Sequence, residues 1–202
     1  MLIVGLGNPG ITADSLGPEV IGNLHMTRHL IREYGLKSTE KQILHAISGI
    51  VPGVMGQTGM ETSEIVEGVV EITRPDVVIA VDALAARNTR RLNRTIQITD
   101  TGITPGSGVG NARPKIDRQT MGVPVVSIGV PTVVDAMTLA ADLLGREEAG
   151  MEEEISPRGE PMVVTPREID LLIDRAAKLV SMAINHALQP SFTLEDLGTL
   201  VS

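Results

Sequence analysis

Two aspartates stand where a parallel sheet would present them to a ligand. Asp14 follows a short apolar segment and a glycine-rich turn, and Asp82 directly follows the β-branched segment 77–81. Ligands of open α/β sheets bind beyond the carboxyl ends of the strands, so two neighbouring strands would bring these carboxyl groups to one edge. Two carboxyl groups held close together do not both ionise readily, because the second charge is repelled by the first. Such a pair can hold a water molecule, with the ionised member as base and the protonated member as acid.

Each aspartate also has an ordinary structural interpretation. Asp14 is a residue type favoured at the N-cap of the helix expected after it. Asp82 could cap a short helix from Ala83 to Arg87, or form an ion pair with Arg87. The prediction of catalysis therefore depends on the pair and not on either residue alone.

Glycine-rich loops near these aspartates are candidates for substrate binding. Segment 105–111 (PGSGVGN) contains more glycine than packing requires, and segment 52–61 has the same character. Backbone N–H groups in such loops can approach a substrate carbonyl or pair with an extended peptide; a purely structural loop is the alternative. Arg87 could anchor an acidic substrate, hold the ionised aspartate, or be solvated. The expected substrate contacts are Asn8, Glu61, Arg87, Gly106, Ser107, Gly108, Gly110 and Asn111.

Strand-like and helix-like segments alternate along the chain. The patterns predict strands over 2–6, 42–50, 76–81, 94–99 and 123–130, and helices over 14–34, 61–72, 132–144 and 165–188. The strand at 94–99 alternates apolar and polar residues, which is typical of a sheet edge. This alternation of strands and helices predicts a three-layer α/β/α fold with a mostly parallel central sheet. We expect one domain over 1–188, with a mobile loop at 145–160 and a C-terminal tail at 189–202.

Composition excludes several classes of function. The chain has 202 residues and a net charge of −8, and aromatic residues make up 1% of it. The negative charge disfavours binding to a phosphate backbone, and the lack of aromatic rings disfavours stacking on nucleic-acid bases. Cysteine is absent, which excludes thiolate chemistry. No apolar run reaches the ~20 residues of a membrane span, so we expect a soluble protein.

The first glycine turn satisfies a nucleotide-binding pattern without its physical context. Gly5, Gly7 and Gly10 match G-x-G-x-x-G after a strand. That motif requires a helix to begin within the glycines, so that free N–H groups hold a pyrophosphate. Pro9 removes one such donor, and residues 11–14 intervene before the expected helix. The glycines are better explained by a tight turn from strand to helix.

Longer strings carry a more specific signal. They are 4–8 (VGLGN), 14–18 (DSLGP), 26–30 (MTRHL), 52–64 (PGVMGQTGMETSE), 81–87 (VDALAAR), 100–111 (DTGITPGSGVGN), 129–135 (GVPTVVD), 162–168 (MVVTPRE) and 185–188 (NHAL). Together they make the chain resemble the spore germination protease family, endopeptidases that degrade small acid-soluble spore proteins. The resemblance extends from residue 2 to about residue 188.

The resemblance implies an aspartic-type hydrolase without a metal or other cofactor, in which Asp14 and Asp82 match the two essential aspartates. It implies a fold related to that of the hydrogenase maturation endopeptidases. Small acid-soluble spore proteins would be the substrate, with no direct nucleic-acid or membrane partner. The protein would be a homo-oligomer, a tetramer by resemblance, made as a zymogen in the cytoplasm of the forespore and spore core.

The sequence also departs from the family. Family members carry a substantial segment before the strand that opens this chain, and a long insertion where this chain has only 145–160. We therefore interpret the chain as a shortened form. Two alternatives to an active protease stay open: an inactive or weakly active remnant that acts as a binding or structural module, and a metal-dependent endopeptidase of the maturation type.

Overall fold

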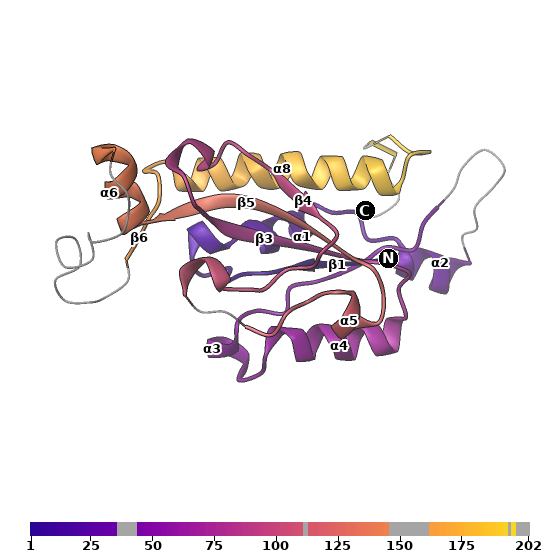
Figure 1. Cartoon of the computed structure of the whole chain (residues 1–202). Coiled ribbons are helices and arrows are strands. Elements are labelled where there is room, and N and C mark those ends of the chain that lie inside the picture. The colour runs from indigo at the N-terminus through magenta and orange to yellow at the C-terminus, as the bar shows by residue number, and fades with distance from the viewer. Residues whose placement is uncertain (36–43, 111–112, 146–161, 194, 197–202) are drawn as a thin grey trace.

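A mostly parallel sheet lies at the centre of the molecule (Figure 1). The computed structural model describes residues 1–35, 44–110, 113–145, 162–193 and 195–196. The strand order is β2-β1-β3-β5-β4, and β6 pairs with β5 off this path. The strands are β1 (Leu2–Gly5), β2 (Ser48–Ile50), β3 (Val78–Ala86), β4 (Gln97–Thr99), β5 (Val125–Asp135) and β6 (Val163–Val164). Strands β2, β1, β3 and β5 run parallel, whereas β4 and β6 pair with β5 in the antiparallel sense.

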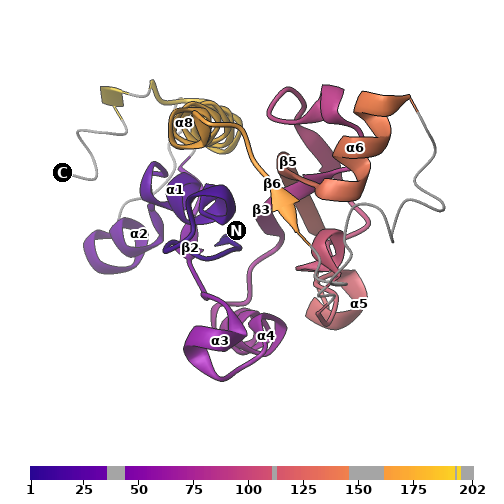
Figure 2. The same ribbon diagram turned by 90° about the vertical axis from the view of Figure 1, so that its left-hand side faces the viewer.

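Helices cover both faces of this sheet, as the end-on view shows (Figure 2). The helices α1 and α8 lie on one face, and α4 and α5 lie on the other. The α-helices are α1 (Leu16–Gly22), α2 (Arg28–Tyr34), α3 (Met55–Thr58), α4 (Thr62–Thr73), α5 (Arg118–Met121), α6 (Ala136–Leu144) and α8 (Ile169–Leu188). The described residues also form the short 3-10 helices η1 (Thr12–Asp14), η2 (Thr89–Arg91) and η3 (Ser107–Val109). The expected three-layer α/β/α class is confirmed.

Alternate residues of β1 and β3 build the two cores. Ile3, Ile79 and Val81 pack under α1 and α8, whereas Leu2 and Val4 pack toward α4. Because both faces of these strands are buried, their apolar residues form continuous runs. A strand with one solvent-exposed face would instead alternate apolar and polar residues. The register aligns Gly5 of β1 with Val81 of β3, so β1 ends one residue before Asp82.

Two strands are longer than their sequence patterns predict. The strand expected at 76–81 continues as β3 to Ala86, so Asp82 lies inside the strand and not at its end. The strand expected at 123–130 continues as β5 to Asp135, whose side chain caps α6 by accepting Met137 N–H at 2.8 Å. These two strands pair with each other along most of their length. This cross-strand pairing carries both strands past the point where their apolar patterns end.

Three helical predictions need correction. The helix expected over 14–34 is divided into η1, α1 and α2. The helix expected over 132–144 begins only at Ala136, because the residues before it belong to β5. The capping signature at Thr165 is wrong: α8 begins at Ile169, and the Thr165 hydroxyl donates to the carbonyl of Thr132 instead.

The other elements predicted from the sequence agree more closely with the structure. Helix α4 begins one residue after the predicted start, and β4 occupies the sheet edge as its alternating pattern predicts. Strand β2 is short, and residues 42–43 of the strand expected there lie outside the described residues, as do 146–160 of the expected loop and 194 and 197–202 of the expected tail. Gln189, the first residue of that tail, is fully buried. Within the described part of the chain, no helix is long and apolar enough to span a bilayer.

Candidate active site

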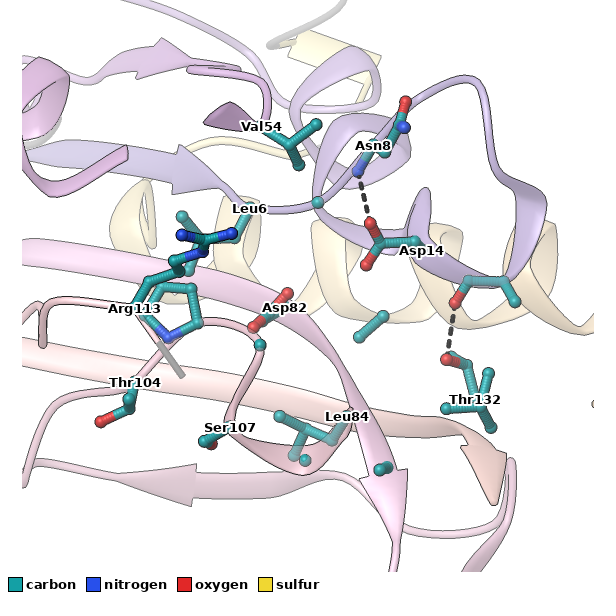
Figure 3. A pocket seen from close by; sticks show the side chains of 18 of the residues that line it. Leu6, Asn8, Asp14, Val54, Asp82, Leu84, Thr104, Ser107, Arg113 and Thr132 are labelled. Carbon is teal, nitrogen blue, oxygen red and sulfur yellow. Dashed lines mark hydrogen bonds between the residues drawn. The ribbon is translucent and has the colours of Figure 1, made fainter. Parts of the chain in front are cut away.

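A cavity of about 760 Å³ opens where β1 ends and β3 continues (Figure 3). Its walls come from the loop after β1, the segment before α4, the second half of β3, and the loop that contains η3. Both Asp14 and Asp82 line it, and their carboxyl groups face the same space. This position agrees with the general tendency of open α/β sheets to bind ligands beyond the carboxyl ends of their strands.

Asp14 is held by the loop that follows β1. The backbone N–H of Asn8 donates to Asp14 Oδ2 at 2.8 Å. Gly7 permits this approach, since it has a φ of +110° and an added Cβ would lie 2.0 Å from the carbonyl oxygen of Asp14. Asp14 itself ends η1, and α1 is capped by Ser15 without a side-chain hydrogen bond. The N-cap interpretation of Asp14 is therefore wrong.

Gly17 brings α1 close to the sheet directly after this loop. A Cβ at this position would lie 2.3 Å from the Leu6 carbonyl oxygen and 2.6 Å from that of Val81. The helix therefore contacts the backbone of β3 immediately before Asp82, and the 3-10 turn that ends in Asp14 is fixed close by. A second contact comes from β5, where the Thr132 hydroxyl donates to the carbonyl of Ala13 at 2.6 Å.

Asp82 is positioned by the sheet itself. It pairs with Gly129 in the β3–β5 register, and its side chain shares a face with Ala80 because side chains alternate along a strand. Only 6% of Asp82 is exposed. Since β3 continues through Ala83, the short helix that Asp82 could have capped does not form. The described residues also contain no ion pair between Asp82 and Arg87.

The two carboxyl groups have different electrostatic environments. Burial raises the pKa of Asp82 to about 8, with a further increase from the nearby Asp14 charge and a smaller opposing effect from the Ala83 N–H. Burial also raises the pKa of Asp14, but the hydrogen bond from Asn8 N–H opposes this by favouring the ionised form. At neutral pH the buried group keeps its proton, and the hydrogen-bonded, more accessible group loses its proton first. Two neighbouring carboxyl groups whose environments differ in this way can act as an acid and a base.

Six of the eight expected substrate contacts line the cavity. They are Asn8, Glu61, Arg87, Gly106, Ser107 and Gly108. Gly110 is exposed and does not line the cavity, so the structure does not bring it to the site. Asn111 lies outside the described residues.

The cavity is also lined by Arg87, Arg91 and Arg113. Arg87 and the neighbouring cluster of Arg90, Arg91 and Arg94 are positive residues that the sequence places near Asp82, whereas Arg113 was not expected at the site. Arg113 lies 3.5 Å from Glu61, measured from Nη1 to Oε1, and Arg91 lines the wall near Arg87. The position of Arg113 two residues beyond the glycine-rich loop was the available signal. Thr132 was also missed, because its segment was expected to start a helix. Across the part of the chain that the structure describes, no three His, Asp or Glu side chains gather in a group that could hold a metal ion.

Comparison with known proteins assigns the family. The sequence model of the peptidase A25 family, described as germination protease, matches residues 1–147. The chain belongs to the germination protease family. The germination protease of Caldanaerobacter subterraneus subsp. tengcongensis is 45% identical over all of this chain and 69% of the relative. That of Clostridium acetobutylicum is 42% identical over the same shares. The expected enzyme class, a peptidase, is confirmed by this membership.

Members of the germination protease family contain residues that this chain lacks. The alignment with the Caldanaerobacter protein extends over 227 positions, which exceeds the 202 residues of this chain. Among solved structures, the NiFe hydrogenase maturation protease HycI from Thermococcus kodakarensis is 20% identical with a TM-score of 0.46, covering 93% of this chain and 90% of that one. The Escherichia coli maturating endopeptidase HybD is 15% identical with a TM-score of 0.40, covering 92% of each chain.

Proposed function

We propose that this chain is an endopeptidase that cleaves small acid-soluble spore proteins during germination, with Asp14 and Asp82 activating a water molecule. The observation that carries the proposal is the pair of carboxyl groups facing one cavity, with burial raising the pKa of Asp82 to about 8 and an N–H hydrogen bond favouring the ionised form of Asp14. Family membership supports the peptidase class, and the cavity supplies the acid–base chemistry that amide hydrolysis needs.

In the proposed reaction, ionised Asp14 accepts a proton from the water held between the two carboxyl groups. The resulting hydroxide oxygen attacks the scissile carbonyl carbon, and the carbonyl oxygen gains negative charge. Backbone N–H groups of Gly106 and Gly108 are candidates to stabilise that oxyanion, because their loop lines the cavity. Protonated Asp82 then donates its proton to the leaving nitrogen as the C–N bond breaks. The proton that Asp14 took from water then passes to Asp82, which restores the pair and completes the division of water between the two products.

Positive charge at the cavity supports an acidic substrate segment. Arg87 and Arg91 are exposed cavity residues without an ion-pair partner in the described ranges, whereas Arg113 faces Glu61. These cations lie on a chain with a net charge of −8, so the cavity differs in charge from the rest of the surface. An extended acidic segment would be attracted there and repelled elsewhere.

The decisive experiment incubates the purified chain with a small acid-soluble spore protein and maps the products by mass spectrometry. We expect one defined cut, no effect of a chelator, and loss of cleavage in Asp14→Asn and Asp82→Asn. Asp174→Asn on the exposed face of α8 is the matched control and should cleave at the parent rate. No cut by a folded parent chain would favour the inactive remnant, whereas inhibition by chelators would favour the metal-dependent alternative.

Two further parts of the proposal concern the setting of the enzyme. We expect a homo-oligomer, a tetramer by family resemblance, which light scattering of the purified chain measures directly. We also expect the protein in the forespore and spore core, with activity controlled by removal of a propeptide. Immunoblots of sporulating cells test both expectations by following the location and size of the protein.

A further inference from the structure

The second half of β3 has one unpaired edge. On one side, β5 pairs with β3 as far as Ala86. On the other side, β1 pairs with β3 only as far as Val81, the residue before Asp82. Among the described strands, none pairs with β3 on this side beyond Val81. The structure therefore leaves a strand edge open beside Asp82.

Backbone groups of alternate residues point to this edge. The Val81 carbonyl accepts Leu6 N–H at 2.8 Å from the β1 side. Because alternate residues of a strand bond on opposite sides, the backbone groups of Ala83 and Ala85 are directed to the same side. The register shift after Leu84 leaves one residue of β5 without a partner in β3. The extra residue is therefore on β5, and the backbone groups of β3 continue to alternate between its two edges.

The open edge borders the cavity that contains both aspartates. All residues from Asp82 to Arg87 line that cavity, and the loop carrying Asp14 forms its other wall. Figure 3 shows Asp14 facing β3 from beyond the end of β1. Most side chains along this part of β3 are alanines, which project little beyond the backbone. The η3 loop lies close to Ala85, since a Cβ on Gly108 would lie 2.8 Å from the Ala85 Cβ.

We propose that the substrate binds as an added β-strand along this open edge of β3, with its scissile amide beside Asp82. The inference rests on the proposed peptidase function and specifies how an extended substrate is held. The four-residue advance from Asp82 to Ala86 spans about 13 Å, so three to four substrate residues pair with β3. Main-chain hydrogen bonds supply affinity there, which makes recognition of those residues depend on extended conformation.

The outer edges of β2 and β4 are competing places for strand addition. Both are unpaired among the described strands. However, a strand added beyond β4 would be separated from β3 by β4 and β5, and one added beyond β2 would be separated from β3 by β2 and β1. A substrate bound there could not present its amide to the aspartate pair.

A backbone scan of the substrate tests the proposal without altering the enzyme. The probe is a synthetic peptide spanning the cut mapped in the small acid-soluble spore protein, with single N-methyl amino acids placed at successive positions. We expect kcat/KM to fall about tenfold at alternate positions over three to four residues on one side of the cut, since each lost hydrogen bond weakens binding. Parent-like cleavage of every N-methylated peptide would overturn strand addition while leaving the peptidase function intact. Failure to cleave the unmodified peptide would instead contradict the proposed function.

An enzyme variant tests the same contact from the other side. Ala85→Pro removes an N–H directed to the open edge and leaves the β5 pairing in place. We expect a fall in kcat/KM of about tenfold, with an unchanged cut site. Asp174→Asn on the exposed side of α8, away from the cavity, is the control and is expected within about twofold of the parent. Thermal melting tests whether Ala85→Pro folds; parent-like kcat/KM of folded Ala85→Pro would contradict the proposed pairing.

Discussion

The two halves of β3 have opposite environments. From Val78 to Val81 the strand is paired on both edges and fully or nearly fully buried. From Asp82 to Ala86 it is paired only with β5 and lines a cavity. The change occurs within one residue, where β1 ends. A single strand thus contributes to the core with its first half and to the candidate site with its second.

This contrast separates the residues that stabilise the fold from those that would perform chemistry. In the first half, apolar side chains leave water and lower the free energy of the folded chain. At the boundary, a carboxyl group is buried at a cost, because its charged form loses hydration. A group that destabilises the fold and faces a cavity is a candidate for function. The following predictions test whether the two halves separate in this way.

The largest effect is expected from Asp82→Asn. The amide cannot donate a proton to the leaving nitrogen, so kcat/KM should fall by roughly 10²–10⁴. Urea denaturation should show the opposite effect on stability. Asp82 stays protonated in the folded chain up to about pH 8 but ionises near its ordinary value of 3.8 when unfolded. The parent therefore loses stability as pH rises from about 4 to 8, and the Asn variant does not.

The predicted change in stability of Asp82→Asn can be checked by its size. Between pH 5 and pH 8, Asp82→Asn should gain up to about 4 kcal/mol relative to the parent. Asp174→Asn, which is exposed on α8, should show no such pH-dependent gain. A variant that loses both activity and stability at pH 8 would place Asp82 among the structural residues and remove the contrast.

Beside the first half of β3, Ile3→Ala in β1 should lower stability and leave activity unchanged. Ile3 is fully buried beside Ile79, so truncation should lower the free energy of unfolding by about 2–5 kcal/mol. Cleavage measured per folded molecule should stay within about twofold of the parent. Ile72→Ala, at a position 82% exposed on α4, is the control and should change stability by less than about 0.5 kcal/mol. A loss of kcat in Ile3→Ala that is still folded would show that the buried half of β3 influences the chemistry at its second half.

The pH dependence of cleavage sharpens the roles of the two aspartates. Because Asp82 must stay protonated, kcat/KM should decrease above about pH 8, approaching tenfold per pH unit. The acidic side should decrease where Asp14 takes up a proton, at a pH above the ordinary 3.8 of an aspartate. The pH values at which cleavage falls on the acidic and the alkaline side are properties of the interacting pair and not of either aspartate alone. Constant cleavage from pH 7 to pH 10 would exclude a protonated Asp82 as the acid.

The sequence predicted the parts of the fold that depend on local pattern. The β-branched run before Asp82 and the apolar periodicity of α4 gave a strand and a helix close to their observed places. The extension of β3 to Ala86 was not predictable from Ala-Leu-Ala-Ala, a sequence with strong helix propensity. Pairing with β5 overrides that propensity. The break between α1 and α2 was missed for a similar reason, because the apolar spacing continues through it.

The candidate site was predictable where glycines and acids have distinctive surroundings. Asp14, Asp82 and the loop from Gly106 to Gly108 were found from their positions after strands or in glycine-rich runs. Arg113 and Thr132 were not, since an isolated arginine and a threonine in an apolar run carry no local signal. Their roles depend on contacts between segments distant in sequence.

The smallest effect is expected from Thr132→Val in β5, opposite the second half of β3. The substitution keeps the shape but removes the hydroxyl that donates to the Ala13 carbonyl, next to Asp14. Stability should fall by about 1 kcal/mol, and kcat/KM should fall a few-fold because Asp14 is held less firmly. Thr73→Val removes a comparable hydroxyl bond to the Val69 carbonyl within α4, away from the cavity. It should alter stability alone, so an equal loss of activity in both variants would mean that Thr132 contributes only to the general stability of the fold.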